Sequence, residues 1–284
     1  MPIARTYNAN PPNVQIALTT EEEDDTTRTD VDTGSDTQDA GVPALTEIRE
    51  RGLVQEVVSV VKSGKEATVY CCRTITGKGP EFVAAKVYRE RADRAFKNDA
   101  VYWAGSSLGK RREQLAFRKK TRVGRELQAR RWTSREYETL SILHAAGADV
   151  PKPIAATGET LIMEFFGDEH GAAPQLQHVT LARDEVPLLY QRVLDNVALW
   201  LAHHRVHADL SAFNILYWQG TVKVIDFPQA VDPRQNPNAW DLLQRDLENV
   251  HRYFARYGID GDPAWITHDL HRQYTDPRYR ALSR

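Results

Sequence analysis

Apolar and β-branched residues between positions 53 and 88 form short runs that polar turns separate. Two of these runs, 53–61 and 67–72, flank the segment Lys-Ser-Gly-Lys-Glu. Two strands joined by a short polar turn with a glycine are typical of a β-hairpin. A third run, 81–88, follows a Gly-Lys-Gly-Pro turn. The pattern therefore predicts three consecutive strands.

The apolar spacing becomes mostly helical farther along the chain. A helix is predicted from near Trp132 to Gly147, followed by two short strands, the second ending at Phe166. After Gly167, apolar residues recur every three or four positions, which places them on one face of a helix. Two such stripes contain Leu189, Val193, Val197 and Trp200, then Trp240, Leu243, Leu247, Val250 and Phe254. A β-rich first half and a helical second half predict an α+β fold of two lobes, with the crossover near Gly167.

The beginning of the chain differs in composition from the rest. Residues 1–48 include an acidic, threonine-rich segment with almost no large apolar side chains, so this tail is expected to be disordered. The net charge of -2 provides no global attraction to nucleic acid or to an anionic membrane. No apolar run approaches the ~20 residues of a transmembrane helix, and the N-terminus lacks the apolar core of a signal peptide. Cys71 and Cys72 are adjacent and are not expected to bridge each other, so a cytoplasmic protein without membrane contact is predicted.

Two carboxylates and an amide between residues 207 and 226 have the spacing that phosphoryl transfer requires. Asp209 is followed five positions later by Asn214, and Asp226 ends the apolar run 222–225. One carboxylate can accept the proton of an attacking hydroxyl, while an amide and a second carboxylate can hold magnesium. A turn or N-cap role would explain Asp209 alone, but not Asn214 or a carboxylate buried after an apolar strand. The set predicts a phosphoryl-transfer site.

Lys86 interrupts the apolar run 83–87. Such a lysine either extends from a sheet edge or reaches a cleft that binds phosphate, and the downstream acidic residues favour the cleft. Its ammonium then needs a carboxylate partner, for which Glu136 on the following helix is the prediction. Glu138 is the alternative, because one helical position changes the face by ~100°. The turn at 63–67 contains one glycine and by itself is an ordinary hairpin turn.

Four segments resemble the RIO family of atypical serine/threonine protein kinases, and its type-1 branch most closely. They are residues 63–70 in the nucleotide loop, 163–167 at the hinge, 207–216 in the catalytic loop and 225–231 at the metal site. The last is the most specific, because ordinary protein kinases carry Asp-Phe-Gly there and continue into a long activation loop. The resemblance covers about residues 50–258. It implies a two-lobed protein-kinase-like fold that lacks the activation loop and the peptide-binding subdomain.

The resemblance also implies a role for each site residue. Asp209 would be the catalytic base, and Asn214 and Asp226 would hold magnesium, or manganese in its place. In RIO enzymes the metal-binding aspartate can itself take the phosphoryl group, so Asp226 is a candidate aspartyl-phosphate site and the enzyme could act mainly as an ATPase. His207 is expected to brace the catalytic loop. The residues predicted to bind ATP are Ser63, Gly64, Lys65, Val69, Lys86, Glu136, Met163, Glu164 and Phe166.

The family pattern divides the chain into the tail 1–48, an N-lobe of residues 49–166 and a C-lobe of residues 167–284. The basic segment 89–131 matches the position of the family's flexible loop, which carries autophosphorylation sites. Ser106 and Ser107 are the nearest hydroxyls in that segment.

Two residues depart from the family pattern. Pro228 stands where a serine is usual, which removes a hydroxyl and a backbone donor beside the metal ligand. Ala212 replaces a glutamate that is common in the catalytic loop. Neither change alters the expected metal ligands, but both bear on how the acceptor substrate is expected to bind and react.

Two other functions are compatible with parts of the sequence. A small-molecule phosphotransferase of the aminoglycoside or choline kinase type shares the two aspartates and the asparagine, but the loop 63–67 and the short connector 167–188 argue against it. A kinase-fold scaffold or ribosome assembly factor could contact RNA through the basic segment 89–131. Intact Lys86 and Asp209 argue against a dead enzyme. The protein acceptor is not named by the sequence.

Overall fold

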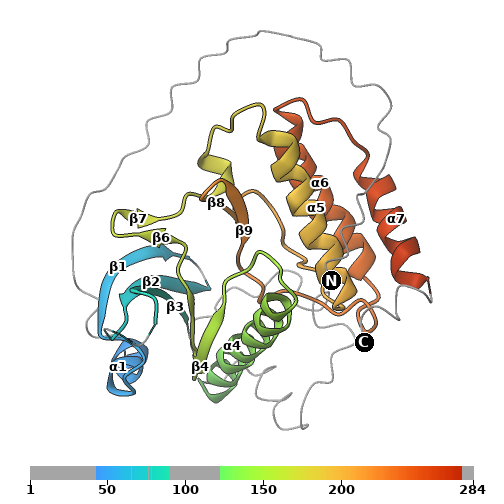
Figure 1. Cartoon of the computed structure of the whole chain (residues 1–284). Coiled ribbons are helices and arrows are strands. Elements are labelled where there is room, and N and C mark those ends of the chain that lie inside the picture. The colour runs from blue at the N-terminus through green and yellow to red at the C-terminus, as the bar shows by residue number, and fades with distance from the viewer. Residues whose placement is uncertain (1–42, 65, 76, 78, 90–121, 277–284) are drawn as a thin grey trace.

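A computed structural model describes residues 43–64, 66–75, 77, 79–89 and 122–276. These residues form two lobes, one rich in strands and one helical, with helix α4 between them (Figure 1). The predicted tail as far as residue 42, Lys65, and positions 90–121 of the basic segment with Ser106 and Ser107 lie outside the described residues. No helix within the described part of the chain is long and apolar enough to cross a membrane.

The N-lobe is built on a five-stranded antiparallel sheet with the strand order β1-β2-β3-β5-β4. Its strands are β1 (Glu56–Ser63), β2 (Ala67–Arg73), β3 (Phe82–Tyr88), β4 (Pro153–Thr157) and β5 (Thr160–Glu164). Side chains alternate across β3 as they do in any strand. Val83, Ala85 and Val87 pack in a core with helix α1 (Pro43–Glu50), whereas Lys86 lines the cavity on the other face.

The C-lobe is built on the two predicted amphipathic helices, α5 (Val186–Ala202) and α6 (Ala239–Ala255). Their apolar stripes meet in one core, which also receives α7 (Pro263–Thr275). A two-stranded hairpin of β8 (Ile215–Trp218) and β9 (Thr221–Val224) also belongs to this lobe, and residues 225–238 connect it to α6. The remaining short elements are β6 (Gly167–Asp168), β7 (Gly171–Ala172) and the 3₁₀ turn η2 (Leu176–His178).

Three features differ from the sequence-based expectation. Residues 43–48, assigned to the disordered tail, belong to α1, where Ala44, Leu45 and Ile48 are buried against the sheet. A helix this short depends on tertiary packing rather than on its own propensity, which explains why composition did not reveal it. Helix α4 spans Arg122–Ala145, so it begins before Trp132 and includes the end of the basic segment. Helix α7 was not predicted.

Candidate active site

A cavity of about 650 Å³ lies between the two lobes. Most of the predicted site residues line it, namely Gly64, Val69, Lys86, Met163, Glu164, Phe166, Asp209, Asn214 and Asp226. Ser63 ends β1 outside this lining, and its hydroxyl accepts a hydrogen bond from Arg89 at 2.5 Å. Glu136 lies behind the cavity wall and is completely buried. The fold thus brings residues from both halves of the sequence to one cleft.

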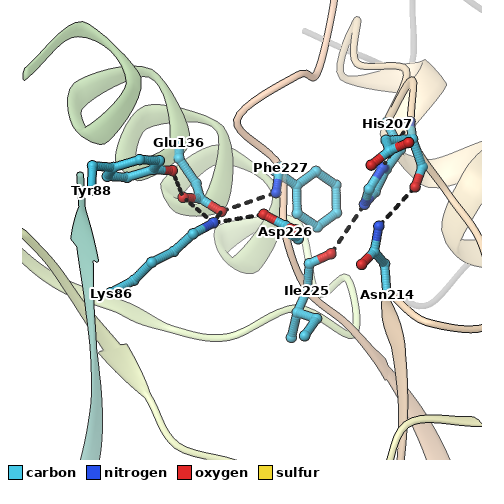
Figure 2. A network of polar contacts seen from close by, with 9 residues as sticks. Lys86, Tyr88, Glu136, His207, Asn214, Ile225, Asp226 and Phe227 are labelled. Atoms are coloured by element: carbon cyan, nitrogen blue, oxygen red, sulfur yellow. Dashed lines mark hydrogen bonds and ion pairs between the residues drawn. The ribbon is translucent and has the colours of Figure 1, made fainter. Parts of the chain in front are cut away.

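Lys86 is the centre of the polar contacts in this cleft (Figure 2). Its ammonium lies 2.8 Å from each carboxylate oxygen of Glu136 and 2.7 Å from Asp226 Oδ1. The carboxylate of Glu136 also accepts hydrogen bonds from the Phe227 N–H at 3.0 Å and from the Tyr88 hydroxyl. Of the two glutamates considered from sequence, Glu136 is therefore the partner, because Glu138 is 70% exposed and lies near Arg205 instead.

The two carboxylates keep Lys86 charged. Burial by itself would lower the pKa of Lys86, but the nearby charges of Asp226 and Glu136 raise it well above its usual value. Burial would raise the pKa of Asp226, and the ammonium of Lys86 more than offsets this effect, so the Asp226 pKa is lowered. Both groups of this pair are ionised at neutral pH.

Asp226 occupies an unusual backbone position at the end of β9. Its φ angle is +74°, which is rare for a residue with a side chain. The preceding residue, Ile225, is held on both sides: its N–H donates to the Asn214 carbonyl at 2.9 Å, and its carbonyl lies 3.1 Å from His207 Nε2. Such strain persists only where the surroundings fix it, and it is frequent at functional sites.

His207 braces the catalytic loop through both ring nitrogens. Burial is the main cause that lowers the pKa of His207 to about 4, so the ring is neutral at pH 7. The carbonyl of Ile225 requires a proton on Nε2, and Nδ1 then accepts the Asp209 N–H at 3.3 Å. The histidine links the catalytic loop to the strand that carries Asp226.

Asp246 on α6 holds the catalytic loop from the opposite side. Its buried carboxylate accepts the N–H groups of Ala208 at 2.7 Å and of Leu210 at 2.9 Å. The neighbouring Arg245 donates to the Ala208 carbonyl. Ala208 has a φ of +66°, so these contacts fix a second strained residue. Burial raises the pKa of Asp246 to about 7.

Neither Asp246 nor Arg245 was predicted from the sequence. The signal was available, because Asp246 interrupts the buried stripe of α6 between Leu243 and Leu247. A carboxylate on a buried face needs partners, and two backbone N–H groups provide them here.

Asp209 has the properties of a general base. It is exposed at the cavity, yet partial burial and then the charge of Asp226 raise its pKa to about 6. Arg245 and Asn214 oppose this shift. A carboxylate with a raised pKa that remains ionised at neutral pH can accept a proton from an attacking hydroxyl.

The oxygen atoms at the base of the cavity suit a magnesium ion. Asp226 is 40% exposed, and the Asn214 amide nitrogen donates to the Asp209 carbonyl at 2.8 Å, so the amide oxygen is the atom of this side chain that could face a metal. No group of three or more His, Cys, Asp or Glu side chains capable of holding a metal occurs among the described residues. Magnesium fits this sparse set, because proteins bind it through one or two carboxylates together with substrate phosphates.

Comparison with known proteins gives concordant matches. The RIO domain family matches residues 68–265. The serine/threonine-protein kinase RIO1 of Homo sapiens is 31% identical over 229 residues, which are 80% of this chain and 38% of the relative. The RIO-type serine/threonine-protein kinase Rio1 of Thermoplasma acidophilum is 34% identical over 191 residues, which are 67% of this chain and 93% of that protein. This chain therefore spans about two fifths of the human relative and nearly all of the archaeal one.

The solved structures agree on the fold. The Rio2 kinase of Chaetomium thermophilum, solved as an ADP/Mg2+-phosphoaspartate complex, has a TM-score of 0.60 and 22% identity. The match covers 84% of this chain and 68% of that one. The two-lobed α+β architecture predicted from the sequence is confirmed.

Proposed function

The chain belongs to the RIO domain family, and on this premise we propose that it is an ATP-dependent serine/threonine protein kinase that also hydrolyses ATP. The main support for the proposal is that one cavity is lined by all four residues expected to act on ATP, namely Lys86, Asp209, Asn214 and Asp226. Glu136 holds the ammonium of Lys86 in place. The relatives reported above are RIO kinases, which supports this proposal over a small-molecule phosphotransferase or an RNA assembly factor.

We propose that the N-lobe of residues 49–166 and the C-lobe of residues 167–284 bind ATP between them. Val69 and Met163 would form the apolar walls for the adenine. At the hinge, Glu164 N–H donates to the Lys152 carbonyl and the Phe166 carbonyl accepts from Ala173. The proposed adenine contacts are therefore the Glu164 carbonyl and the Phe166 N–H.

The phosphate end of the nucleotide would meet the polar side of the cavity. Lys86 would contact the phosphates, and the backbone near Gly64 and Lys65 would cover them. Asn214 and Asp226 are the proposed ligands of magnesium, or of manganese, since a set of oxygen ligands suits both ions. ATP with its metal supplies a phosphoryl group whose negative charge is partly neutralised.

Asp209 would orient the attacking hydroxyl and accept its proton as the new phosphorus–oxygen bond forms, while the bond from the γ-phosphorus to the β–γ bridging oxygen breaks and ADP leaves. In a second route, an Asp226 oxygen attacks the γ-phosphorus, the bond to the β–γ bridging oxygen breaks, and ADP leaves. Water then hydrolyses the acyl phosphate, with Asp209 accepting a proton from the water. The phosphoaspartate of the Rio2 structure named above supports this route, which would make the protein mainly an ATPase.

The test uses purified protein with γ-labelled ATP and magnesium. Wild type is compared with Asp209→Ala and Asp226→Asn, and with Asp184→Asn as a control, because Asp184 is exposed and outside the cavity. We expect ATP turnover and labelled protein for wild type and control, and loss of both in the two site variants. Wild-type turnover in both site variants would refute the proposed site.

The chemical stability of the label separates the two routes. Acid-stable label indicates phosphoserine or phosphothreonine, as expected for autophosphorylation of residues such as Ser106 or Ser107. Label that hydroxylamine releases indicates an acyl phosphate on a carboxylate, as expected for Asp226.

A further inference from the structure

A second cavity, of about 590 Å³, lies against helix α4 and shares no lining residue with the proposed ATP site. Five arginines line it: Arg130, Arg131, Arg135, Arg205 and Arg234. The acidic residues among the described residues of its lining are Glu138 and Asp232. We refer to this cavity as the arginine pocket.

Three segments that are distant in sequence build the arginine pocket. Helix α4 contributes Arg131 and Arg135, which are one helical turn apart on the same face. The other wall consists of the turn after α5 and the segment that follows Asp226. These two segments lie side by side, because Val206 and Val231 exchange two backbone hydrogen bonds of 2.9 Å. That bridge places Arg205 beside the segment containing Arg234. Arg135 connects the two walls through a 2.5 Å hydrogen bond to the Ala230 carbonyl.

The two carboxylates do not balance the five guanidinium groups. Asp232 is engaged by Arg234, whose Nη2 lies 2.6 Å from it. Glu138 is 70% exposed and lies 3.6 Å from Arg205, so it contributes little in water. Arg205 itself is only 15% exposed. Among the described lining residues, guanidinium groups therefore outnumber carboxylates by five to two, and Arg135 and Arg205 are partly buried.

The electrostatics of Arg135 agree with this imbalance. Burial lowers the pKa of Arg135, and the positive charges of Arg205 and Arg131 lower it further, against a smaller opposing effect of Glu138. An anion in the pocket would offset the desolvation cost of the buried cations and would reduce their mutual repulsion.

We propose that the arginine pocket binds a phosphate monoester dianion, such as a phosphorylated serine or threonine side chain or free phosphate. A guanidinium group presents a planar set of N–H donors that matches two phosphate oxygens at once. The Ser134 hydroxyl and the Gln235 amide in the same lining can donate further hydrogen bonds. Arginines gathered around one cavity suit a single dianion, whereas an RNA strand requires a positive track along several phosphates.

Binding in the arginine pocket would connect the two lobes. The anion would bridge α4, which carries Glu136, to the turn before the catalytic loop and to the segment after Asp226. We therefore expect phosphate to slow amide hydrogen exchange in residues 130–139 and 230–235 of the wild-type protein.

The test is calorimetric titration of the full chain with inorganic phosphate and, separately, with O-phosphoserine. A saturating non-hydrolysable ATP analogue with magnesium is present throughout, so that phosphate cannot bind at the ATP site. The double variant Arg131→Gln/Arg205→Gln removes one cation from each wall. The control, Arg183→Gln/Arg252→Gln, changes the net charge equally at exposed positions outside the pocket.

We expect one site for both probes, unchanged in the control and weakened at least about tenfold in the pocket variant, since each guanidinium makes charge-assisted hydrogen bonds. If that variant has a lowered melting temperature, Arg130→Gln/Arg234→Gln is used in its place. Equal affinities in the pocket and control variants would overturn the proposal. Binding of a single-stranded oligoribonucleotide without binding of either monoester would also overturn it, in favour of an RNA contact.

Discussion

Replacement of Glu136 by glutamine tests the central ion pair, and replacement of Glu138 provides a matched control. Both substitutions remove one negative charge from α4, two positions apart. In the structure, Glu136 is completely buried and accepts hydrogen bonds from Lys86, from the Phe227 N–H and from the Tyr88 hydroxyl. Glu138 is 70% exposed and has one carboxylate oxygen 3.6 Å from Arg205.

The expected magnitudes differ severalfold. Removing one partner of a buried ion pair costs about 3–5 kcal/mol. Because Lys86 retains Asp226 at 2.7 Å and glutamine retains one acceptor oxygen, we expect Glu136→Gln to lower the free energy of unfolding by about 2–4 kcal/mol. An exposed pair contributes roughly 0–1 kcal/mol, so Glu138→Gln should lie in that range.

Urea denaturation followed by tryptophan fluorescence measures both changes, and ATP turnover is measured in parallel. Turnover should fall in Glu136→Gln, because Lys86 then has Asp226 as its one remaining carboxylate partner among the described residues, and should stay near wild type in Glu138→Gln. Equal losses of stability in the two variants, or a larger loss in Glu138→Gln, would refute the assignment of Glu136 as the structural partner of Lys86.

Three further predictions concern the catalytic loop and the hinge. Turnover of ATP should fall as the pH decreases through about 6, because the pKa of Asp209 is raised to about 6 and only its ionised form accepts a proton; a pH–rate profile with its acidic limb near 4 would contradict this. Asp246→Ala leaves two buried N–H groups without an acceptor and should lower the free energy of unfolding by roughly 2–4 kcal/mol, whereas unchanged urea unfolding would argue against its bracing role. Gly167→Ala should destabilise the protein by roughly 1–3 kcal/mol in thermal unfolding, because its φ is +154° and a Cβ there would clash with the Gly171 carbonyl oxygen; a wild-type melting temperature would show that the hinge can adjust.

The strands and the long C-lobe helices could be predicted because their apolar period is local. The alternation in β3 suffices to place Lys86 on the face opposite Val83 and Ala85. The sequence favoured Glu136 as the partner of Lys86 and left Glu138 as the alternative, because the final choice depends on how α4 is rotated against the sheet. Rotation is set by packing among distant segments, and the predicted start of α4 was itself too late.

Parts of the site that depend on distant contacts were not visible in the sequence. The spacing of Asp209, Asn214 and Asp226 is local and indicated the chemistry directly. Asp246, in contrast, reaches backbone N–H groups 36 and 38 positions earlier in the chain. Nothing near Asp246 in sequence indicates those partners, and only its place on a buried helical face marks it as unusual. The arginine pocket escaped notice for the same reason, because its two walls meet only in the fold.

The structure also indicates how the proposed site is kept ready for a nucleotide. Lys86 is a single ammonium between two carboxylates, and its charge is the largest of those that lower the pKa of Asp226. Glu136 is buried and held by Phe227 and Tyr88, whereas Asp226 is 40% exposed at the cavity. When a phosphate group competes for Lys86, the exposed contact with Asp226 is therefore the one that can be exchanged. Asp226 would then be available to a metal ion or to the phosphoryl group, without any change in the pair that positions Lys86.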